Sequence, residues 1–286
     1  MSDHKLITGD CLEVMRGMES NSVDLVFTSP PYEDARTYGI GFSAAGDEWV
    51  RWCVPRVMEC LRVCKGMACW VVEGRTRGYR YSNAPMRLAV AAEYAGAVPR
   101  KPPIYNRVGI PGSGGPDWLR NDYEFVLAWT REAGRLPWSD NTAMGHPPKF
   151  GPGGAPSHRL ADGTRVSAKV QTRRKANGER VRDGLYRPPA KANPGNVIRC
   201  HGGGGHLGSK LSHENEAPFP ESLAEFFIKS FCPPGGTCLD PFGGSGTVAA
   251  VCERLGRNSI SIDIRASQTE LQKRRIEEAK SKIEAA

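Results

Sequence analysis

The sequence lacks the features that would place it in a membrane or a secretory pathway. Its 286 residues contain no run of about 18 apolar residues, the length that a transmembrane helix needs. The N-terminal residues Met1-Ser2-Asp3-His4-Lys5 hold no apolar signal-peptide core. These absences predict a cytoplasmic protein that does not partner a membrane.

A cysteine framework is also missing. The sequence has nine cysteines, an odd number, and none forms a Cys-x-x-Cys pair. This count and spacing argue against a set of disulfides and against a zinc knuckle. Cys53, Cys60 and Cys64 instead fall at helical spacing in an apolar stretch, where free cysteine behaves as a small core residue. We therefore expect reduced thiols and no metal site.

Positive charge is concentrated in one segment. Between Arg135 and Ser212 there are 14 Lys and Arg against 4 Asp and Glu, a surplus of 10, so the rest of this +8 chain carries about −2. A basic, Gly- and Pro-rich segment on a nearly neutral body is typical of polyanion binding, although a solvated loop has the same composition. The length predicts one large domain with an insertion, which we place at 135–212, between 1–134 and 213–286.

Short apolar runs alternate with amphipathic stretches on both sides of that insertion. This alternation predicts an α/β fold with a doubly wound, mostly parallel sheet. The expected strands are Lys5–Thr8, Val23–Thr28, Met67–Val72, Phe125–Thr130, Thr237–Leu239 and Ser259–Ile264. The expected helices are Cys11–Met18, Asp47–Val63, one that begins near Pro218, Thr247–Leu255 and one that begins near Ser267.

A glycine-rich turn stands between a predicted strand and a predicted helix. It reads Asp240-Pro241-Phe242-Gly243-Gly244-Ser245-Gly246-Thr247. Such a turn binds ligands in doubly wound sheets, because glycines let a ligand approach the backbone and the helix N-terminus offers free N–H groups. No Lys follows the last glycine, so the turn is not a phosphate-binding P-loop. Asp263, near the end of the next strand, can accept hydrogen bonds from ribose hydroxyls. The pair suggests an adenosine-containing cofactor, although tight βα turns also use glycine for geometry alone.

A second strand end carries Thr28-Ser29-Pro30-Pro31-Tyr32. Its two prolines fix φ and remove two N–H donors, so the carbonyls there face outward as acceptors. Acceptors beside an aromatic ring suit an exocyclic amino group whose base stacks on Tyr32. A rigid turn with no ligand is the alternative for this pentapeptide alone.

Together the two motifs resemble those of the S-adenosylmethionine-dependent DNA amino-methyltransferases, which carry a (D/N/S)PPY turn and a DPFxGSGT cofactor loop. Their order, with a variable region between them, is similar to the permuted β class of that family. The resemblance covers 1–134 and 213–286, and 135–212 stands where the family has its target-recognition region. It implies a Rossmann-like methyltransferase fold, S-adenosylmethionine as cofactor and double-stranded DNA as partner. It leaves open a cognate restriction endonuclease and a monomer or homodimer.

The resemblance implies a catalytic pocket formed by Ser29, Pro30, Pro31 and Tyr32. The Ser29 Oγ and the Pro30 carbonyl would accept hydrogen bonds from the target amino group, and Tyr32 would stack on a flipped-out base. Family members with Ser before Pro-Pro-Tyr mostly methylate cytosine N4, whereas Asp or Asn marks adenine-N6 enzymes. Ser29 therefore favours cytosine, with adenine N6 as the alternative.

The cofactor contacts are carried over in the same way. Asp10 and Cys11 resemble the strand end that contacts adenine, and Asp263 matches the ribose-binding acid. Arg265 departs from the pattern, because an Asp is common there. The other implied contacts are Phe219, Pro220, Asp240, Phe242, Gly243, Gly244, Ser245, Gly246 and Thr247.

Basic residues inside the insertion are candidate phosphate contacts, with a solvated loop as the alternative. They are Arg173, Arg174, Lys175, Arg180 and Arg182. Two other functions stay open, because a fold does not settle its substrate. One is an RNA or small-molecule methyltransferase, although the basic insertion disfavours small molecules. The other is a DNA-binding module with a degenerate cofactor site, which the intact glycines and Pro-Pro-Tyr disfavour.

Overall fold

The computed structural model describes residues 2–33, 41–109, 114–148, 157–167, 170–174, 180–185, 189–203 and 205–285. The chain divides into two compact units, one formed by Met1–Asp140 with Gly195–Ala286 and the other by Asn141–Pro194. Within the described residues, no helix combines the length and the apolarity that crossing a membrane requires.

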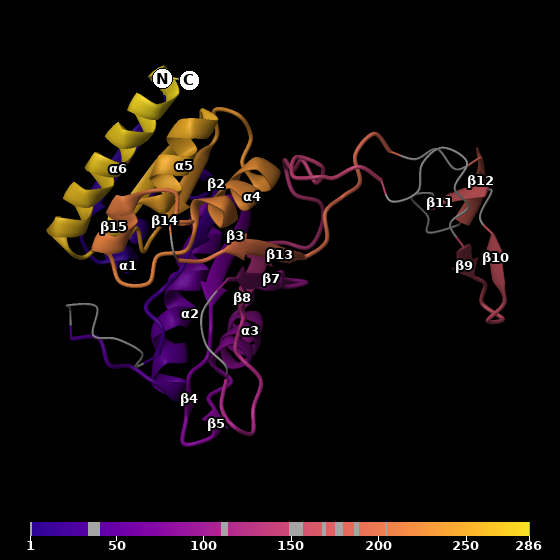
Figure 1. Ribbon diagram of the computed structural model, residues 1–286, viewed down its shortest axis with the longest axis horizontal. Helices are drawn as coiled ribbons and strands as arrows, with labels where there is room; N and C mark the ends of the chain where they lie inside the picture. The colour runs from indigo at the N-terminus through magenta and orange to yellow at the C-terminus, as the bar shows by residue number, and fades with distance from the viewer. Residues whose placement is uncertain are drawn as a thin grey trace. The chain divides into compact units, whose positions relative to one another are not determined.

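A nine-stranded sheet forms the centre of the first unit (Figure 1). Its strands are β1 (His4–Thr8), β2 (Val23–Thr28), β3 (Cys64–Val72), β6 (Val98–Arg100), β7 (Ile104–Val108), β8 (Tyr123–Thr130), β13 (Val197–His201), β14 (Thr237–Asp240) and β15 (Asn258–Asp263). They follow the order β1-β15-β14-β2-β3-β8-β7-β13, and β6 also pairs with β8. In the run β1-β15-β14-β2-β3 every neighbouring pair of strands is parallel. The pair β7 and β13 is also parallel, whereas β8 is antiparallel to β3, β6 and β7. The predicted mostly parallel sheet is confirmed.

Helices cover both faces of this sheet. They are α1 (Cys11–Arg16), α2 (Gly46–Val63), α3 (Ala84–Tyr94), α4 (Glu221–Phe231), α5 (Thr247–Leu255) and α6 (Ala266–Glu284). Successive strand residues face opposite sides, so in β2 Val26 joins the core under α1, α2 and α3, whereas Leu25 and Phe27 join the core under α4 and α5. The helix α6 packs against α5. A short hairpin, β4 (Thr76–Arg77) with β5 (Arg80–Tyr81), follows β3.

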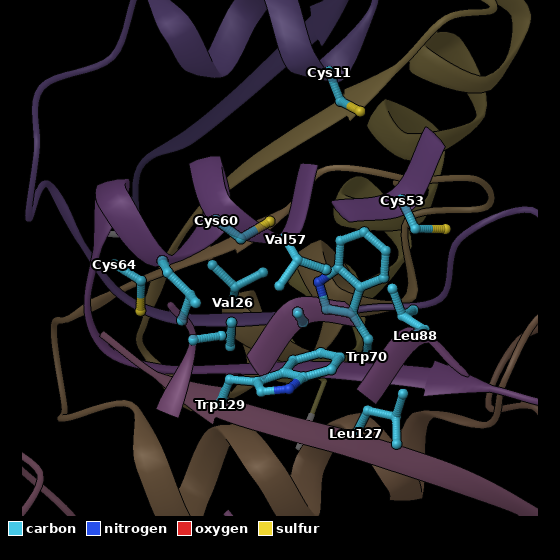
Figure 2. Packing of buried hydrophobic residues seen from close by; sticks show 14 of the residues in the cluster. Cys11, Val26, Cys53, Val57, Cys60, Cys64, Trp70, Leu88, Leu127 and Trp129 are labelled. Atoms are coloured by element: carbon cyan, nitrogen blue, oxygen red, sulfur yellow. The ribbon is translucent and has the colours of Figure 1, made fainter. Parts of the chain in front are cut away.

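The core under α2 contains three buried tryptophans, Trp49, Trp70 and Trp129. Trp70 from β3 and Trp129 from β8 are both almost fully buried, and Cys60 of α2 lies in the same cluster (Figure 2). All nine cysteines are buried and none is in a disulfide. Burial raises the pKa of the Cys53 and Cys60 thiols well above its ordinary value, which keeps them protonated. The predicted place of Cys53, Cys60 and Cys64 in the core is confirmed.

The second unit contains two antiparallel hairpins. One joins β9 (Ser157–Arg159) to β10 (Arg165–Ser167), and the other joins β11 (Val170–Arg174) to β12 (Arg180–Leu185). This unit is shorter than the insertion that the sequence predicts at 135–212. The strand β13 falls inside that range, yet it pairs with β7 in the main sheet, so residues 195–212 belong to the first unit. Five residues followed by a glycine run give too short a pattern to predict such a strand.

Candidate active site

The carboxyl ends of β1, β2, β14 and β15 meet at one edge of the sheet, which is where doubly wound folds bind ligands. Because β8 runs the other way, its first residues lie at that same edge. A cavity of about 400 Å³ opens there, and it brings the two predicted motifs together. The predicted residues that line it are Asp10, Cys11, Ser29, Pro30, Pro31, Tyr32, Phe219, Asp240, Phe242, Gly243, Gly244, Ser245, Thr247 and Asp263.

Two predicted residues lie beside this lining. Pro220 stands at the N-cap of α4. Gly246 stands at the N-cap of α5 with φ of 80°, a left-handed conformation that favours glycine. Both positions therefore shape the helix ends next to the cavity.

The glycine loop is packed too tightly for side chains. A Cβ on Gly243 would lie 2.1 Å from Ser261 Oγ and 2.5 Å from Gln272 Nε2. The N–H of Gly244 donates to Asp263 Oδ2 at 2.9 Å, and the N–H of Arg265 donates to Oδ1 at 2.9 Å. These two bonds fix the carboxylate of Asp263 at the end of β15.

Asp240 is buried at the end of β14. Its Oδ1 accepts a hydrogen bond from Thr28 Oγ1 at 2.6 Å and another from the Phe242 N–H at 3.1 Å. Burial raises the pKa of Asp240 to about 7, although both hydrogen bonds favour the charged form. The Phe242 ring packs edge-on against Trp70, with 5.5 Å between the ring centroids. The bond from Thr28 joins the two motifs directly, since Thr28 begins the Pro-Pro-Tyr turn.

Asp10 serves first as the N-cap of α1. Its Oδ1 accepts the Leu12 N–H at 2.8 Å, and its Oδ2 accepts from Arg56 Nη2 at 2.8 Å. Burial acts to raise the pKa of Asp10, but the Arg56 guanidinium and the backbone N–H groups bring it below its ordinary value. Beside it, burial raises the pKa of Cys11 to about 11, so this thiol is protonated at neutral pH.

The Pro-Pro-Tyr turn is held against α2. The Pro31 carbonyl accepts a hydrogen bond from Trp49 Nε1 at 2.8 Å. The buried Glu33 carboxylate accepts the N–H of Gly46 at 3.0 Å and that of Arg75 at 3.2 Å. These contacts fix the turn, so Ser29 and Tyr32 project from a rigid support.

Three residues that the sequence did not predict complete the wall beside Tyr32. They are Tyr105 and Arg107 of β7 and Glu124 of β8. Tyr32 Oη donates to Glu124 Oε2 at 2.7 Å, and Arg107 Nη1 lies 3.1 Å from Glu124 Oε1. Burial raises the pKa of Glu124 above its ordinary value, while Arg107 opposes that rise. The β-branched and aromatic residues Ile104, Tyr105 and Val108, types that are common in strands, are a signal that could have indicated a strand here.

The candidate phosphate contacts lie on one hairpin of the second unit. Arg173 and Arg174 are on β11, and Arg180 and Arg182 are on β12. Arg174 pairs with Arg180 across the hairpin. Lys175 falls outside the described residues. Among the residues that the structure does describe, no group of His, Cys, Asp and Glu could hold a metal ion.

A family model described as DNA methylase, covering N6 and N4 methyltransferases, matches residues 23–274. The chain belongs to this family. The resemblance read from the two motifs is therefore confirmed. S-adenosylmethionine is the methyl donor of the family, as those motifs predicted.

Individual DNA methylases match nearly the whole chain. The type II methyltransferase M.HpaI of Haemophilus parainfluenzae is 27% identical over 285 residues, which cover 96% of this chain and 74% of the relative. The DNA adenine methyltransferase YhdJ of Escherichia coli is 24% identical over 279 residues, covering 96% and 83%.

Solved structures confirm the predicted fold. The PvuII DNA methyltransferase, described as cytosine-N4-specific, superposes with a TM-score of 0.66 at 19% identity, covering 98% of this chain and 91% of that one. A putative DNA modification methylase of Thermus thermophilus, solved with S-adenosylmethionine, gives a TM-score of 0.60 at 22% identity, covering 96% and 94%.

Proposed function

We propose that this DNA methylase transfers the methyl group of S-adenosylmethionine to the exocyclic N4 of a cytosine that is flipped out of duplex DNA. One observation carries the proposal. Ser29 and Tyr32 line the same cavity as Phe242, Gly244 and Asp263, so an amino-binding turn and a nucleoside-binding loop face one space.

The loop side of the cavity fits the cofactor. Asp263 is fixed by two backbone N–H groups at the strand end, where a carboxylate can accept the ribose hydroxyls. The backbone of Gly243 and Gly244 lines the cavity beside Asp263, and Phe242 adds an apolar surface. S-adenosylmethionine, when bound, supplies an electrophilic methyl group on a sulfonium. We assign Asp10, Cys11 and Phe219 to the rest of this site, because they line the same cavity.

The turn side of the cavity fits an amino group. The lone pair of that group is delocalised into the base, so acceptors must draw the nitrogen toward tetrahedral geometry. Ser29 Oγ and the Pro30 carbonyl are those acceptors, and the anchoring of Pro31 by Trp49 holds them in place before the reaction. Flipping the base costs a few kcal/mol, and stacking on Tyr32 offsets about 1–3 kcal/mol.

The choice of cytosine over adenine depends on Ser29. The relatives include an adenine methyltransferase, and the structural neighbours include a cytosine-N4-specific enzyme, so these comparisons do not separate the two bases. Adenine N6 is accordingly the second candidate. Identification of the methylated nucleoside distinguishes them.

The second unit, Asn141–Pro194, is the proposed target-recognition element. Its β11–β12 hairpin carries arginines on both strands, which suits contacts with DNA phosphates.

Replacement of Tyr32 tests the pocket. Tyr32→Ala should lower methyl transfer to DNA strongly, because the stacking surface is removed, while S-adenosylmethionine binding measured by calorimetry should be retained. Tyr94→Ala is the matched control, since Tyr94 is 89% exposed on α3, outside the cavity. A Tyr32→Ala variant that methylates DNA at the parental rate would show that the base does not bind on this turn.

A further inference from the structure

A chain of hydrogen bonds leads from Ser29 through Tyr32 to the half-buried carboxylate of Glu124. Ser29 Oγ donates to Tyr32 Oη at 3.4 Å, and Tyr32 Oη donates to Glu124 Oε2 at 2.7 Å. All three residues line the cavity. The donors point in one direction, from the side chain that faces the amino group toward Glu124.

The surroundings of Glu124 suit a proton acceptor. Its side chain is 13% exposed, and Arg107 Nη1 lies 3.1 Å from Oε1. The other titratable groups that face it are Tyr32 from the turn, Tyr105 from β7 and Glu73 after β3. Burial raises the pKa of this carboxyl while the Arg107 guanidinium favours its charged form, and a base works best when its pKa approaches the operating pH.

The proposed reaction produces a proton that must leave the amino group. As the lone pair of N4 forms a bond to the methyl carbon, the bond from that carbon to sulfur breaks, and its electron pair stays on sulfur. The cofactor becomes a neutral thioether, and the positive charge passes to N4. The nitrogen becomes neutral again when it loses one of its two original protons.

We propose that Glu124 takes up this proton through Tyr32 and Ser29. The proton of N4 passes to Ser29 Oγ, the hydroxyl proton of Ser29 passes to Tyr32 Oη, and the phenolic proton of Tyr32 passes to Glu124 Oε2. Ser29 and Tyr32 each end with one proton, as they began, and Glu124 ends as a carboxylic acid. This inference rests on the proposed role of the Pro-Pro-Tyr turn.

Two variants separate proton uptake from simple support of Tyr32. Glu124→Gln keeps a side-chain oxygen that can accept the Tyr32 hydrogen bond, but this oxygen cannot take up the proton. Tyr32→Phe keeps the stacking ring but removes the hydroxyl that links Ser29 to Glu124. Each should lower the single-turnover rate of methyl transfer by about 100-fold, the scale of general base catalysis. The affinities for S-adenosylmethionine and for DNA should stay at parental values.

Glu221→Gln is the matched control. Glu221 is also 13% exposed and is also paired with arginine, in this case Arg275, but it lies on α4 outside the cavity. This variant should keep the parental rate. Thermal unfolding and S-adenosylmethionine binding are measured for each variant to show that it is folded. If Glu124→Gln fails to fold, Tyr32→Phe still tests the proton relay.

The pH profile supplies a readout that a supporting role would not change. Because Glu124 accepts the proton only when ionised, the parental single-turnover rate should rise with pH as Glu124 loses its proton and then level off. Glu124→Gln should lose that dependence. A Glu124→Gln or Tyr32→Phe variant with the parental rate and the parental pH profile would overturn the relay while the proposed function stands. A parental protein that leaves no methylated base would refute the proposed function and the relay together.

Discussion

Protonation of Asp240 should govern part of the pH dependence of stability. Burial raises the pKa of Asp240 from its ordinary 3.8 to about 7 in the folded protein. The folded state therefore keeps a proton that the unfolded chain releases. The stability contributed by this protonated acid is fully present below about pH 3.8 and is lost as the pH rises through about 7. A pKa difference of that size corresponds to on the order of 4 kcal/mol.

Asp240→Asn isolates this effect. Asparagine keeps an oxygen that accepts from Thr28 Oγ1 and from the Phe242 N–H, but it is neutral at every pH. The free energy of unfolding of both proteins is measured by chemical denaturation across this pH range. Subtracting one from the other cancels the contributions of the other titratable groups, because both proteins share them. Between low and neutral pH, the free energy of unfolding of the variant should rise by up to about 4 kcal/mol relative to that of the parental protein. If the difference in free energy of unfolding between the two proteins does not change with pH, the pKa of buried Asp240 is not raised.

Two further predictions concern the cofactor loop and the second unit. Gly243→Ala places a Cβ 2.1 Å from Ser261 Oγ, so it should destabilise the protein by about 1–3 kcal/mol and weaken S-adenosylmethionine binding in calorimetry. Gly195→Ala, which meets nothing within 4 Å, is the control, and equal effects of the two would contradict the tight packing of the loop. Arg173→Ala with Arg174→Ala should weaken DNA binding evenly across sequences and lower the slope of log affinity against log salt by about 1 for each phosphate that the variant no longer neutralises. An unchanged slope would show that these arginines do not bind DNA.

The strand ends that carry the two motifs could be predicted from local sequence alone. The predicted bounds of Val23–Thr28 and of Thr247–Leu255 are those of β2 and α5. In β2 a buried apolar run stops at two prolines. In α5 the flanking Gly246 and Gly256 adopt left-handed φ values of 80° and 67°, which favour glycine at helix ends. Local rules therefore sufficed where proline or glycine marks the end of an element.

The wall beside Tyr32 could not be predicted in this way, because its contacts are not local. Glu124 lies 92 residues from Tyr32, and Arg107 reaches it from the neighbouring strand. The strand β7 lies between β8 and β13, and because β13 follows the second unit in sequence, this second partner is absent from any short window. Glu124 is a single polar residue near the start of an apolar strand. Nothing in the sequence around it indicates that its carboxylate accepts a hydrogen bond from Tyr32. The sequence therefore indicated the turn but not the carboxylate behind it.

The most direct test of the central claim is the identity of the methylated base. The parental protein is incubated with labelled S-adenosylmethionine and duplex DNA of varied sequence, and the DNA is digested to nucleosides for mass spectrometry. We expect the label in N4-methyl-2′-deoxycytidine, and in much smaller amount with Tyr32→Ala. Label in N6-methyl-2′-deoxyadenosine alone would contradict the assignment to cytosine that rests on Ser29.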